Sequence, residues 1–195
     1  MQRGKTPSFK MGEMLIYRSS LECDTHHLLD FDKFIKAYHY EPFRIKNDKR
    51  GAGLLPDFEA ETVDGTKWLF EVKPAAKLEH PRNLEKFKFL KSWCHENGYQ
   101  FGIITDVYLR SGFLLKNIRF LRRYANVVVP QTFRREIIKL LQATEKIRLD
   151  KLSEMIPGEA SQKIIWIYAL LYHGFIVTEI KDIPISLKSW VYIVM

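Results

Sequence analysis

The chain has 195 residues, of which 46% are hydrophobic, 13% aromatic and 28% charged, a composition typical of a folded protein and not of a disordered or fibrous one. No apolar run approaches the roughly 20 residues of a membrane-spanning helix, and no signal peptide follows the basic start. Cys23 and Cys94 lie far apart, which argues against a disulfide framework or a zinc knuckle. We therefore expect a cytoplasmic protein, and the net charge of +8 favours a polyanionic partner, although charge alone decides little.

The first elements are predicted to be two helices. Ser19 and Ser20 can cap the first, because the carboxylates of Glu22 and Asp24 then lie in its first turn, at the positive end of the helix dipole. A second helical pattern, which ends at Glu41-Pro42, has apolar residues spaced as one buried face requires, at Phe31, Phe34, Ile35 and Tyr38.

Residues 54–72 alternate in polarity around Asp64-Gly65, which predicts a β-hairpin. Successive side chains of a strand point to opposite faces, so a shared apolar face fixes the register of the two strands. For this face to be shared, the residue numbers of each pair of opposite residues must add up to 128. A two-residue turn at Asp64-Gly65 would give pairs whose numbers add up to 129. The apolar side chains concerned are Phe58 and Ala60 on the first strand and Trp68 and Phe70 on the second.

A three-residue loop, Val63-Asp64-Gly65 with Gly65 left-handed, satisfies this register. It pairs Asp57 with Glu71 and so places both carboxylates on one face of the hairpin. The structure would contradict the active site described below if it placed them on opposite faces.

A further helix and strand complete the expected core. Pro74 closes the hairpin, a helix is predicted to end at Asn97-Gly98, and residues 99–105 are predicted to form a buried strand. The helix has an apolar stripe of Leu84, Phe87, Leu90, Trp93 and Cys94. The order helix, hairpin, helix, strand predicts an α/β fold with a mixed sheet flanked by helices.

A basic stretch follows, interleaved with Phe113 and Phe120 and free of acids. It is a candidate DNA-binding segment, although a solvated helix face explains it equally well. Its cations are Arg110, Lys116, Arg119, Arg122 and Arg123. Residues 127–130 are expected to be a last strand, and Pro130 is expected to separate a domain of residues 1–130 from one of residues 131–195.

The C-terminal domain is expected to be a winged helix, a variant of the helix-turn-helix. Three short helices are predicted at residues 133–142, 149–155 and 161–173, followed by β-rich segments at 175–180 and 189–194. A small helical domain that only docks partners is the alternative.

Pro56-Asp57, followed by Glu71-x-Lys73 on a hairpin, matches the PD-(D/E)xK nuclease signature. Mg²⁺ or Mn²⁺ takes oxygen ligands, which Asp57, Glu71 and the main-chain carbonyl of Val72 can supply. Lys73 shares their face, so its ammonium can orient a water or stabilise charge on a phosphate. The string alone is weak, because a solvated strand face with a Glu/Lys pair looks the same.

Several further segments extend the pattern in order, over roughly residues 8 to 125. They are Lys10-Met11-Gly12, Ser19-Ser20-Leu21-Glu22-Cys23-Asp24, Glu41-Pro42, Leu55-Pro56-Asp57-Phe58, Asp64-Gly65, Glu71-Val72-Lys73-Pro74 and Ile104-Thr105-Asp106. Together they resemble TnsA, the endonuclease subunit of heteromeric cut-and-paste transposases, including those of CRISPR-associated transposons. Glu41-Pro42 departs from the Gln-Pro associated with that family.

The resemblance implies a restriction-endonuclease-like core with Glu22, Asp57, Glu71 and Lys73 in the active site, Glu22 also serving as a metal ligand. It implies a bacterial, nucleoid-associated enzyme that cuts double-stranded DNA at the 5′ ends of a transposon. A TnsB-type transposase would cut and join the 3′ ends, and a TnsC-type AAA+ ATPase would supply regulation.

Other chemistries lack their motifs. The chain has no phosphate-binding loop, no serine-hydrolase elbow and no histidines at metal-ligand spacing. Two alternatives stay open: a DNA-binding or assembly module of the same complex that does not cut, and a stand-alone restriction or repair nuclease.

Overall fold

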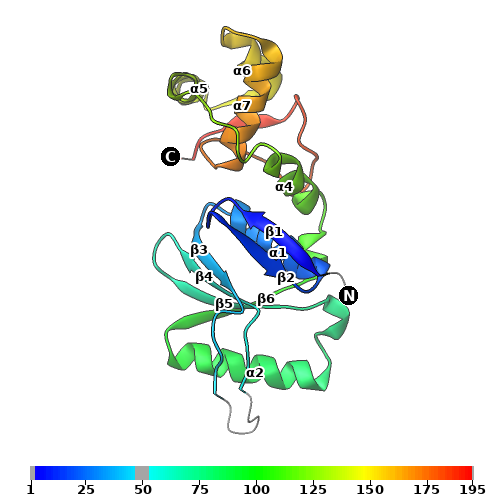
Figure 1. The fold of residues 1–195 in the computed structure, drawn as a ribbon. Helices are drawn as coiled ribbons and strands as arrows, with labels where there is room; N and C mark the ends of the chain where they lie inside the picture. Colours follow the sequence, from blue (N-terminus) through cyan, green and yellow to red (C-terminus); the bar gives the residue numbers. More distant parts are fainter. Residues whose placement is uncertain (1–2, 47–52, 195) are drawn as a thin grey trace. The chain divides into compact units, whose positions relative to one another are not determined.

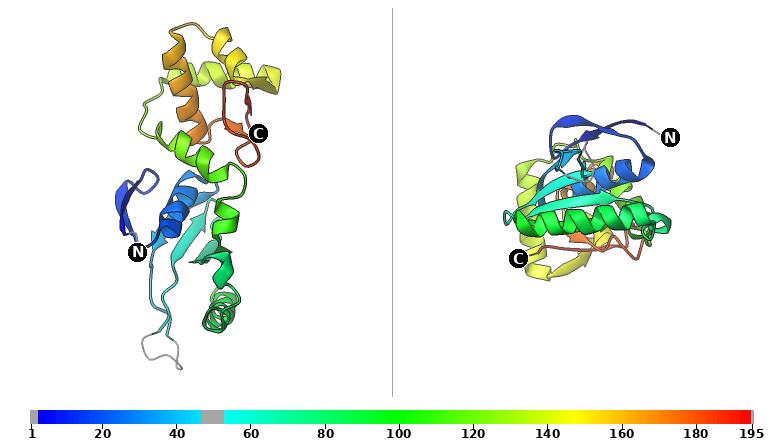
Figure 2. Two further views of the ribbon diagram at one scale, coloured as in Figure 1. Left: turned by 90° about the vertical axis from the view of Figure 1, so that its right-hand side faces the viewer. Right: turned by 90° about the horizontal axis from the view of Figure 1, so that it is seen from below.

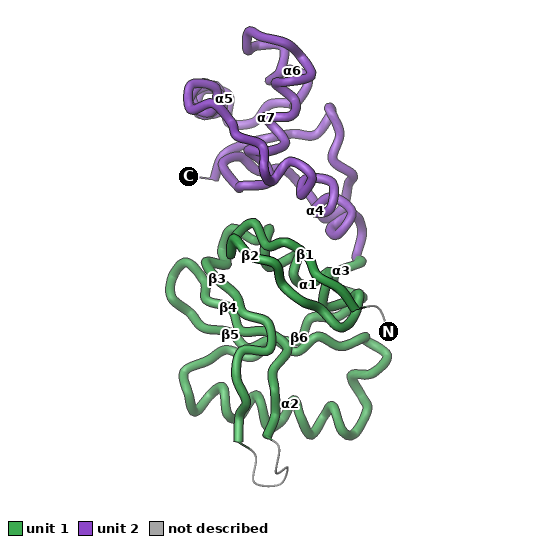
Figure 3. The backbone as a smooth tube through the Cα atoms, viewed as in Figure 1, with its two compact units in different colours: residues 1–110 green, residues 111–195 purple. Residues whose placement is uncertain are grey.

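A computed structural model describes residues 3–46 and 53–194 of the chain. It divides into two compact units, residues 1–110 and residues 111–195 (Figure 3). No helix in the described ranges is long and apolar enough to cross a membrane. Each unit is described separately below.

Unit 1 is built on a four-stranded mixed sheet in the order β3-β4-β5-β6. Neighbouring strands run antiparallel except β5 and β6, which are parallel. The strands are β3 (Ile35–Tyr40), β4 (Phe58–Thr62), β5 (Lys67–Val72) and β6 (Tyr99–Ile104). The predicted mixed sheet is therefore present.

Two long helices cover opposite faces of this sheet (Figures 1 and 2). On one face, α1 (Ser20–Phe31) packs its Leu21 and Leu29 against Phe58 and Ala60 of β4. On the other, α2 (Pro81–Glu96) packs Leu90 and Cys94 against Leu69 of β5. Because strand side chains alternate between faces, β5 and β6 contribute to both hydrophobic cores, whereas β3 and β4 contribute to the core on the α1 side. The short helices η1 (Ala75–Lys77) and α3 (Asp106–Leu109) follow β5 and β6.

The predicted register of the β4–β5 hairpin is confirmed. Phe58 lies opposite Phe70 and Ala60 opposite Trp68, so partner numbers sum to 128. Gly65 has a φ of +86°, the left-handed conformation that the loop was expected to need.

The second predicted helix is wrong, because Phe31 is the last residue of α1 and Ile35–Tyr40 form the strand β3. The helix α1 stops at Phe31, and the next strand pairs antiparallel with β4. A register shift between Ile35 and Ala37 lets Ile35 and Tyr38 both be buried although they lie three residues apart. This bulge-like irregularity gave the strand an apolar spacing that imitates a helix.

A second, two-stranded sheet precedes α1 and was not predicted. It consists of β1 (Gly4–Ser8) and β2 (Glu13–Tyr17). The buried carboxylate of Asp30 accepts hydrogen bonds from the Ser8 hydroxyl at 2.5 Å and from the backbone N–H of Phe9 and Lys10 at 3.2 and 3.0 Å. One carboxylate of α1 therefore anchors the end of β1 and the loop after it.

Unit 2 contains four helices and a small antiparallel sheet in the order β7-β9-β8. Helices α5, α6 and α7 and strands β8 and β9 lie in the segments predicted to be helical and β-rich, whereas β7 was not predicted. The elements are α4 (Leu114–Arg122), α5 (Gln131–Thr144), β7 (Lys146–Arg148), α6 (Leu149–Met155), α7 (Ala160–Tyr172), β8 (Val177–Thr178) and β9 (Trp190–Tyr192). The strand expected at residues 127–130 is absent; those residues have no regular structure.

The division between the units falls at residue 110 and not at the expected Pro130. The buried Asn117 of α4 explains the shift, because its amide donates to the carbonyls of Ile180 and Ile183 at 2.9 and 2.7 Å and accepts from the N–H of Ile185 at 2.9 Å. The ring of Phe120 also packs edge-on against that of Tyr168 of α7. These long-range contacts make α4 part of unit 2.

We predict that Asp30→Ala destabilises unit 1 by roughly 2–3 kcal/mol, because it leaves buried donors without an acceptor. Urea unfolding gives the free energy, and limited proteolysis should show faster cleavage within residues 4–17. Glu13→Ala, which removes an exposed carboxylate of β2, is the control and should change neither. If Asp30→Ala also changed neither, the anchoring role would be disproved.

Candidate active site

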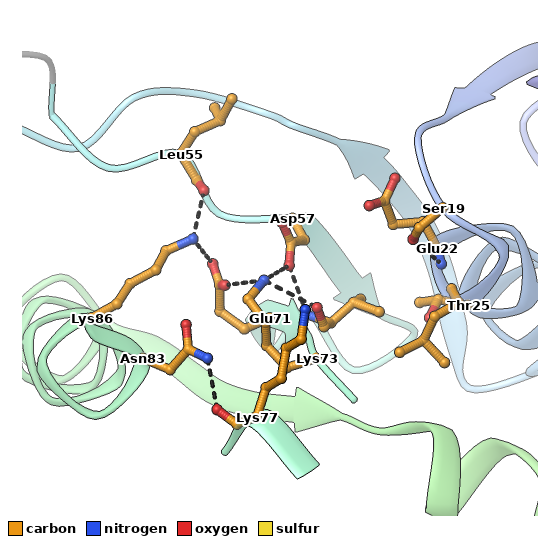
Figure 4. A network of polar contacts seen from close by, with 12 residues as sticks. Ser19, Glu22, Thr25, Leu55, Asp57, Glu71, Lys73, Lys77, Asn83 and Lys86 are labelled. Carbon is orange, nitrogen blue, oxygen red and sulfur yellow. Dashed lines mark hydrogen bonds and ion pairs between the residues drawn. The ribbon is translucent and has the colours of Figure 1, made fainter. Parts of the chain in front are cut away.

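The residues of the nuclease signature meet where β5 ends. Asp57 directly precedes β4, Glu71 and Val72 are the last residues of β5, and Lys73 follows them. The Lys73 ammonium donates to Asp57 Oδ2 and to the Val72 carbonyl, each at 3.0 Å, and lies 3.2 Å from Glu71 Oε2 (Figure 4). The backbone N–H of Val72 also donates to Asp57 Oδ2 at 2.7 Å. The structure therefore brings Asp57, Glu71, Val72 and Lys73 together.

The hairpin explains this meeting. Phe70 and Val72 have partners on the α1 face of the sheet, so Glu71 between them must point to the α2 face. Its side chain has 0% exposure and lies on the side of Leu69 and Leu90. A carboxylate in such a place requires compensating charge or hydrogen bonds.

A second lysine, Lys86 of α2, supplies part of that compensation and was missed by the sequence analysis. Its ammonium lies 2.6 Å from Glu71 Oε1 and donates to the Leu55 carbonyl at 3.1 Å (Figure 4). Lys86 precedes Leu90 by four residues, so it lies on the helix's apolar stripe. A lysine on the buried, apolar stripe of a predicted helix was the signal in the sequence that could have identified Lys86 as a partner of a buried acid.

Burial and charge shift the pKa values of this cluster. Burial raises the pKa of Glu71, and the neighbouring Asp57 carboxylate raises it further, while Lys73 and Lys86 oppose both effects. Burial alone would lower the pKa of Lys73, but the Asp57 and Glu71 carboxylates outweigh it and raise that pKa. Ionised Glu71 thus depends on its two lysines.

Glu22, also predicted for the active site, has no hydrogen bond or ion pair with this cluster in the described parts of the chain. It belongs to α1, which covers the opposite face of the sheet, and its Oε2 accepts from the Tyr40 hydroxyl and from the N–H of Arg18, both at 2.7 Å. Figure 4 draws no contact between Glu22 and Asp57 or Glu71. Within the described parts of the chain, no three His, Cys, Asp or Glu side chains group closely enough to hold a metal ion.

The donors that could hold a metal are thus the Asp57 and Glu71 carboxylates and the Val72 carbonyl. All three are hard oxygen ligands of the kind Mg²⁺ takes, with water or phosphate filling the remaining positions. They already surround one cation, the Lys73 ammonium. The donor set therefore fits a divalent metal.

The predicted DNA-binding cations lie on both units. Arg110 ends α3 of unit 1, while the other four belong to α4 or its C-terminus in unit 2. Lys116 lies over the ring of Phe113 and Arg123 over that of Phe120. Lys116, Arg119 and Arg123 are exposed, and Arg122 is half-buried.

We predict that Lys86→Met destabilises the protein more at pH 8 than at pH 5. Because burial raises the pKa of Glu71 above that of the unfolded chain, the unfolded chain binds fewer protons between these two pKa values, and the free energy of unfolding falls as pH rises toward the folded-state pKa. Removing Lys86 raises this pKa further and should cost roughly 1–3 kcal/mol at pH 8.

Urea unfolding at the two pH values measures this effect. Lys88→Met, which removes an exposed lysine from the same helix, should show a small loss that is equal at both pH values. Equal losses for Lys86→Met at pH 5 and pH 8 would show that Lys86 does not govern the ionisation of Glu71.

A comparison with protein families matches residues 32–106 to the model described as TnsA-like endonuclease N terminal. The matched segment contains β3 to β6 together with Asp57, Glu71, Lys73 and Lys86, but neither Glu22 nor unit 2. No curated protein matches the chain. Residues 32–106 are thus similar to the N-terminal domain of TnsA-like endonucleases, and the resemblance seen in the sequence is confirmed there.

Proposed function

We propose that the protein is a metal-dependent DNA endonuclease that cleaves the 5′ ends of a transposon, together with a TnsB-type transposase and a TnsC-type ATPase. The observation that carries this proposal is the convergence of Asp57, Glu71 and the Val72 carbonyl on one point inside a TnsA-like domain. A protein that only bound DNA would gain nothing from carboxylates that face phosphates.

The proposed chemistry is hydrolysis of a phosphodiester. Mg²⁺ or Mn²⁺, held by Asp57, Glu71 and Val72, would polarise the phosphate and lower the pKa of a water. The Lys73 side chain is 22% exposed, and its ammonium can stabilise negative charge that develops on the phosphate or orient the attacking water. Lys86 holds the second oxygen of Glu71 and so orients that carboxylate.

Glu22 keeps a place in this proposal, although it lies outside the cluster. Its Oε2 is fixed by Tyr40 and by the backbone of Arg18, and the Arg18 side chain pairs with Glu41. We propose that Glu22 contributes to metal or water binding once DNA is present.

Unit 2 is proposed to be a winged-helix domain. The order of α5, β7, α6, α7, β8 and β9 is helix, strand, helix, helix, strand, strand, with the strands joined in one small sheet. This order fits a helix-turn-helix variant that ends in a β-hairpin. Contacts to phosphates are assigned to Arg110, Lys116, Arg119, Arg122 and Arg123.

Asp57→Asn and Lys73→Met are each expected to lower 5′-end cleavage by at least about 100-fold, because they remove a metal ligand and a charge near the phosphate. The assay is nicking of transposon-end DNA with Mg²⁺ or Mn²⁺ and the partner proteins present. Glu22→Gln tests the proposed contribution of Glu22 in the same assay.

Lys88→Met is the matched control and should cleave as the wild type does. Strand joining at the 3′ ends should persist in all variants, because another subunit is proposed to carry it out. Undiminished 5′ cleavage by Asp57→Asn and Lys73→Met would reject the nuclease assignment and favour the assembly module that does not cut.

The double variant Lys116→Ala/Arg119→Ala is expected to weaken DNA binding without changing sequence preference. If each side chain neutralises one phosphate, the slope of log affinity against log salt concentration should fall by about 0.9 for each. Lys139→Ala, on an exposed position of α5, serves as the control. An unchanged slope in the double variant would mean that α4 does not contact phosphates.

A further inference from the structure

A single ammonium group occupies the centre of the proposed metal site. Lys73 Nζ is within 3.2 Å of an oxygen from each of Asp57, Val72 and Glu71, the three groups assigned to the metal. These oxygens cannot hold the ammonium and a divalent ion at the same point, because like charges at such short range repel strongly.

The two lysines that contact Glu71 differ in whether they use the oxygens assigned to the metal. Lys73 contacts Oε2 of Glu71 and also Asp57 Oδ2 and the Val72 carbonyl. Lys86 contacts the other oxygen of Glu71, Oε1, and the Leu55 carbonyl. Lys86 also comes from α2, and Lys73 from the chain just after β5 (Figure 4). A metal on the three shared oxygens would therefore compete with Lys73 and leave the contacts of Lys86 in place.

We propose that Lys73 acts as a built-in substitute for the metal, and that metal binding is an exchange which displaces the Lys73 ammonium while Lys86 stays on Glu71. This inference rests on the proposed function, because it takes the metal site from it.

Charge balance supports the exchange. With both carboxylates ionised, the two negative charges of Asp57 and Glu71 are balanced by the two ammonium groups of Lys73 and Lys86 that lie beside them, without a metal. Adding a divalent ion with both lysines in place would leave an excess of two positive charges around a carboxylate that has 0% exposure. Moving one flexible lysine outward removes half of that excess.

The exchange also gives Lys73 its place in the reaction. Its ammonium is partly exposed and its four-carbon stem is flexible, so displacement turns it away from the acids and toward arriving phosphate. Lys73 would then be free for the substrate only after the metal has bound. Lys86 is a positioning residue, since it acts through Glu71.

Two measurements without DNA test the exchange. The first is mass-spectrometric labelling of lysine amines in the wild-type protein with and without Mn²⁺. Labelling of Lys73 should rise several-fold when Mn²⁺ is added, because its ammonium leaves the three oxygens that hold it and becomes accessible to the reagent. Labelling of Lys86 and of the exposed Lys88 should stay nearly constant.

The second measurement is the Mn²⁺ affinity by calorimetry. Lys73→Met should bind Mn²⁺ tighter by on the order of tenfold, because the competing ammonium is gone. Lys77→Met removes an exposed lysine of η1 that makes no contact with the assigned donors, and its affinity should stay within about twofold of the wild type.

The outcomes separate this inference from the proposed function. Binding of Mn²⁺ that Asp57→Asn abolishes, without tighter binding in Lys73→Met or without a rise in Lys73 labelling, would overturn the exchange and leave the nuclease proposal standing. Absence of any binding that depends on Asp57 would overturn both.

Discussion

A carboxylate with no exposure to solvent is the constraint around which unit 1 is arranged. Glu71 stands at the end of β5, on the face that α2 covers, where a lone charge would be strongly unfavourable. Two lysines, one two residues further along the chain and one from α2, restore the balance. The position of α2 against the sheet is therefore tied to the chemistry of the site as well as to the packing of Leu90 and Cys94 on Leu69.

The parts of this arrangement that depend on local rules could be predicted from the sequence. Strand alternation and a left-handed Gly65 fixed the hairpin register, and that register put Asp57, Glu71 and Lys73 on one face. The helices at residues 81–96 and 160–172 followed from their apolar spacing in the same way. In each case neighbours in the chain determine the structure.

The predictions that failed concern features that depend on contacts between residues far apart in the sequence. A register shift after Ile35 buried side chains at a helical spacing, so β3 looked like a helix. Lys86 is 15 residues from Glu71, and only the packing of α2 brings them together. The unit boundary depends on Asn117, which binds a loop more than 60 residues away. No local pattern reports such contacts, although a lysine on a buried stripe hints at one.

The position of Glu22 shows which residues of the proposed active site a strand motif can bring together and which it cannot. Glu71 and Lys73 lie together because a strand places alternate residues on one face, which is a property of the backbone. Glu22 reaches the same region from α1, on the other face of the sheet, and its carboxylate is held by Tyr40 and Arg18. Strand β3 links it to the Asp57 cluster, because Tyr40 lies opposite Phe58 and the backbone N–H of Glu41 donates to the Asp57 carbonyl at 2.9 Å. Among the described residues no hydrogen bond or ion pair joins the Glu22 carboxylate directly to Asp57, Glu71 or Lys73, so a direct link during cleavage would have to pass through the metal, water or DNA.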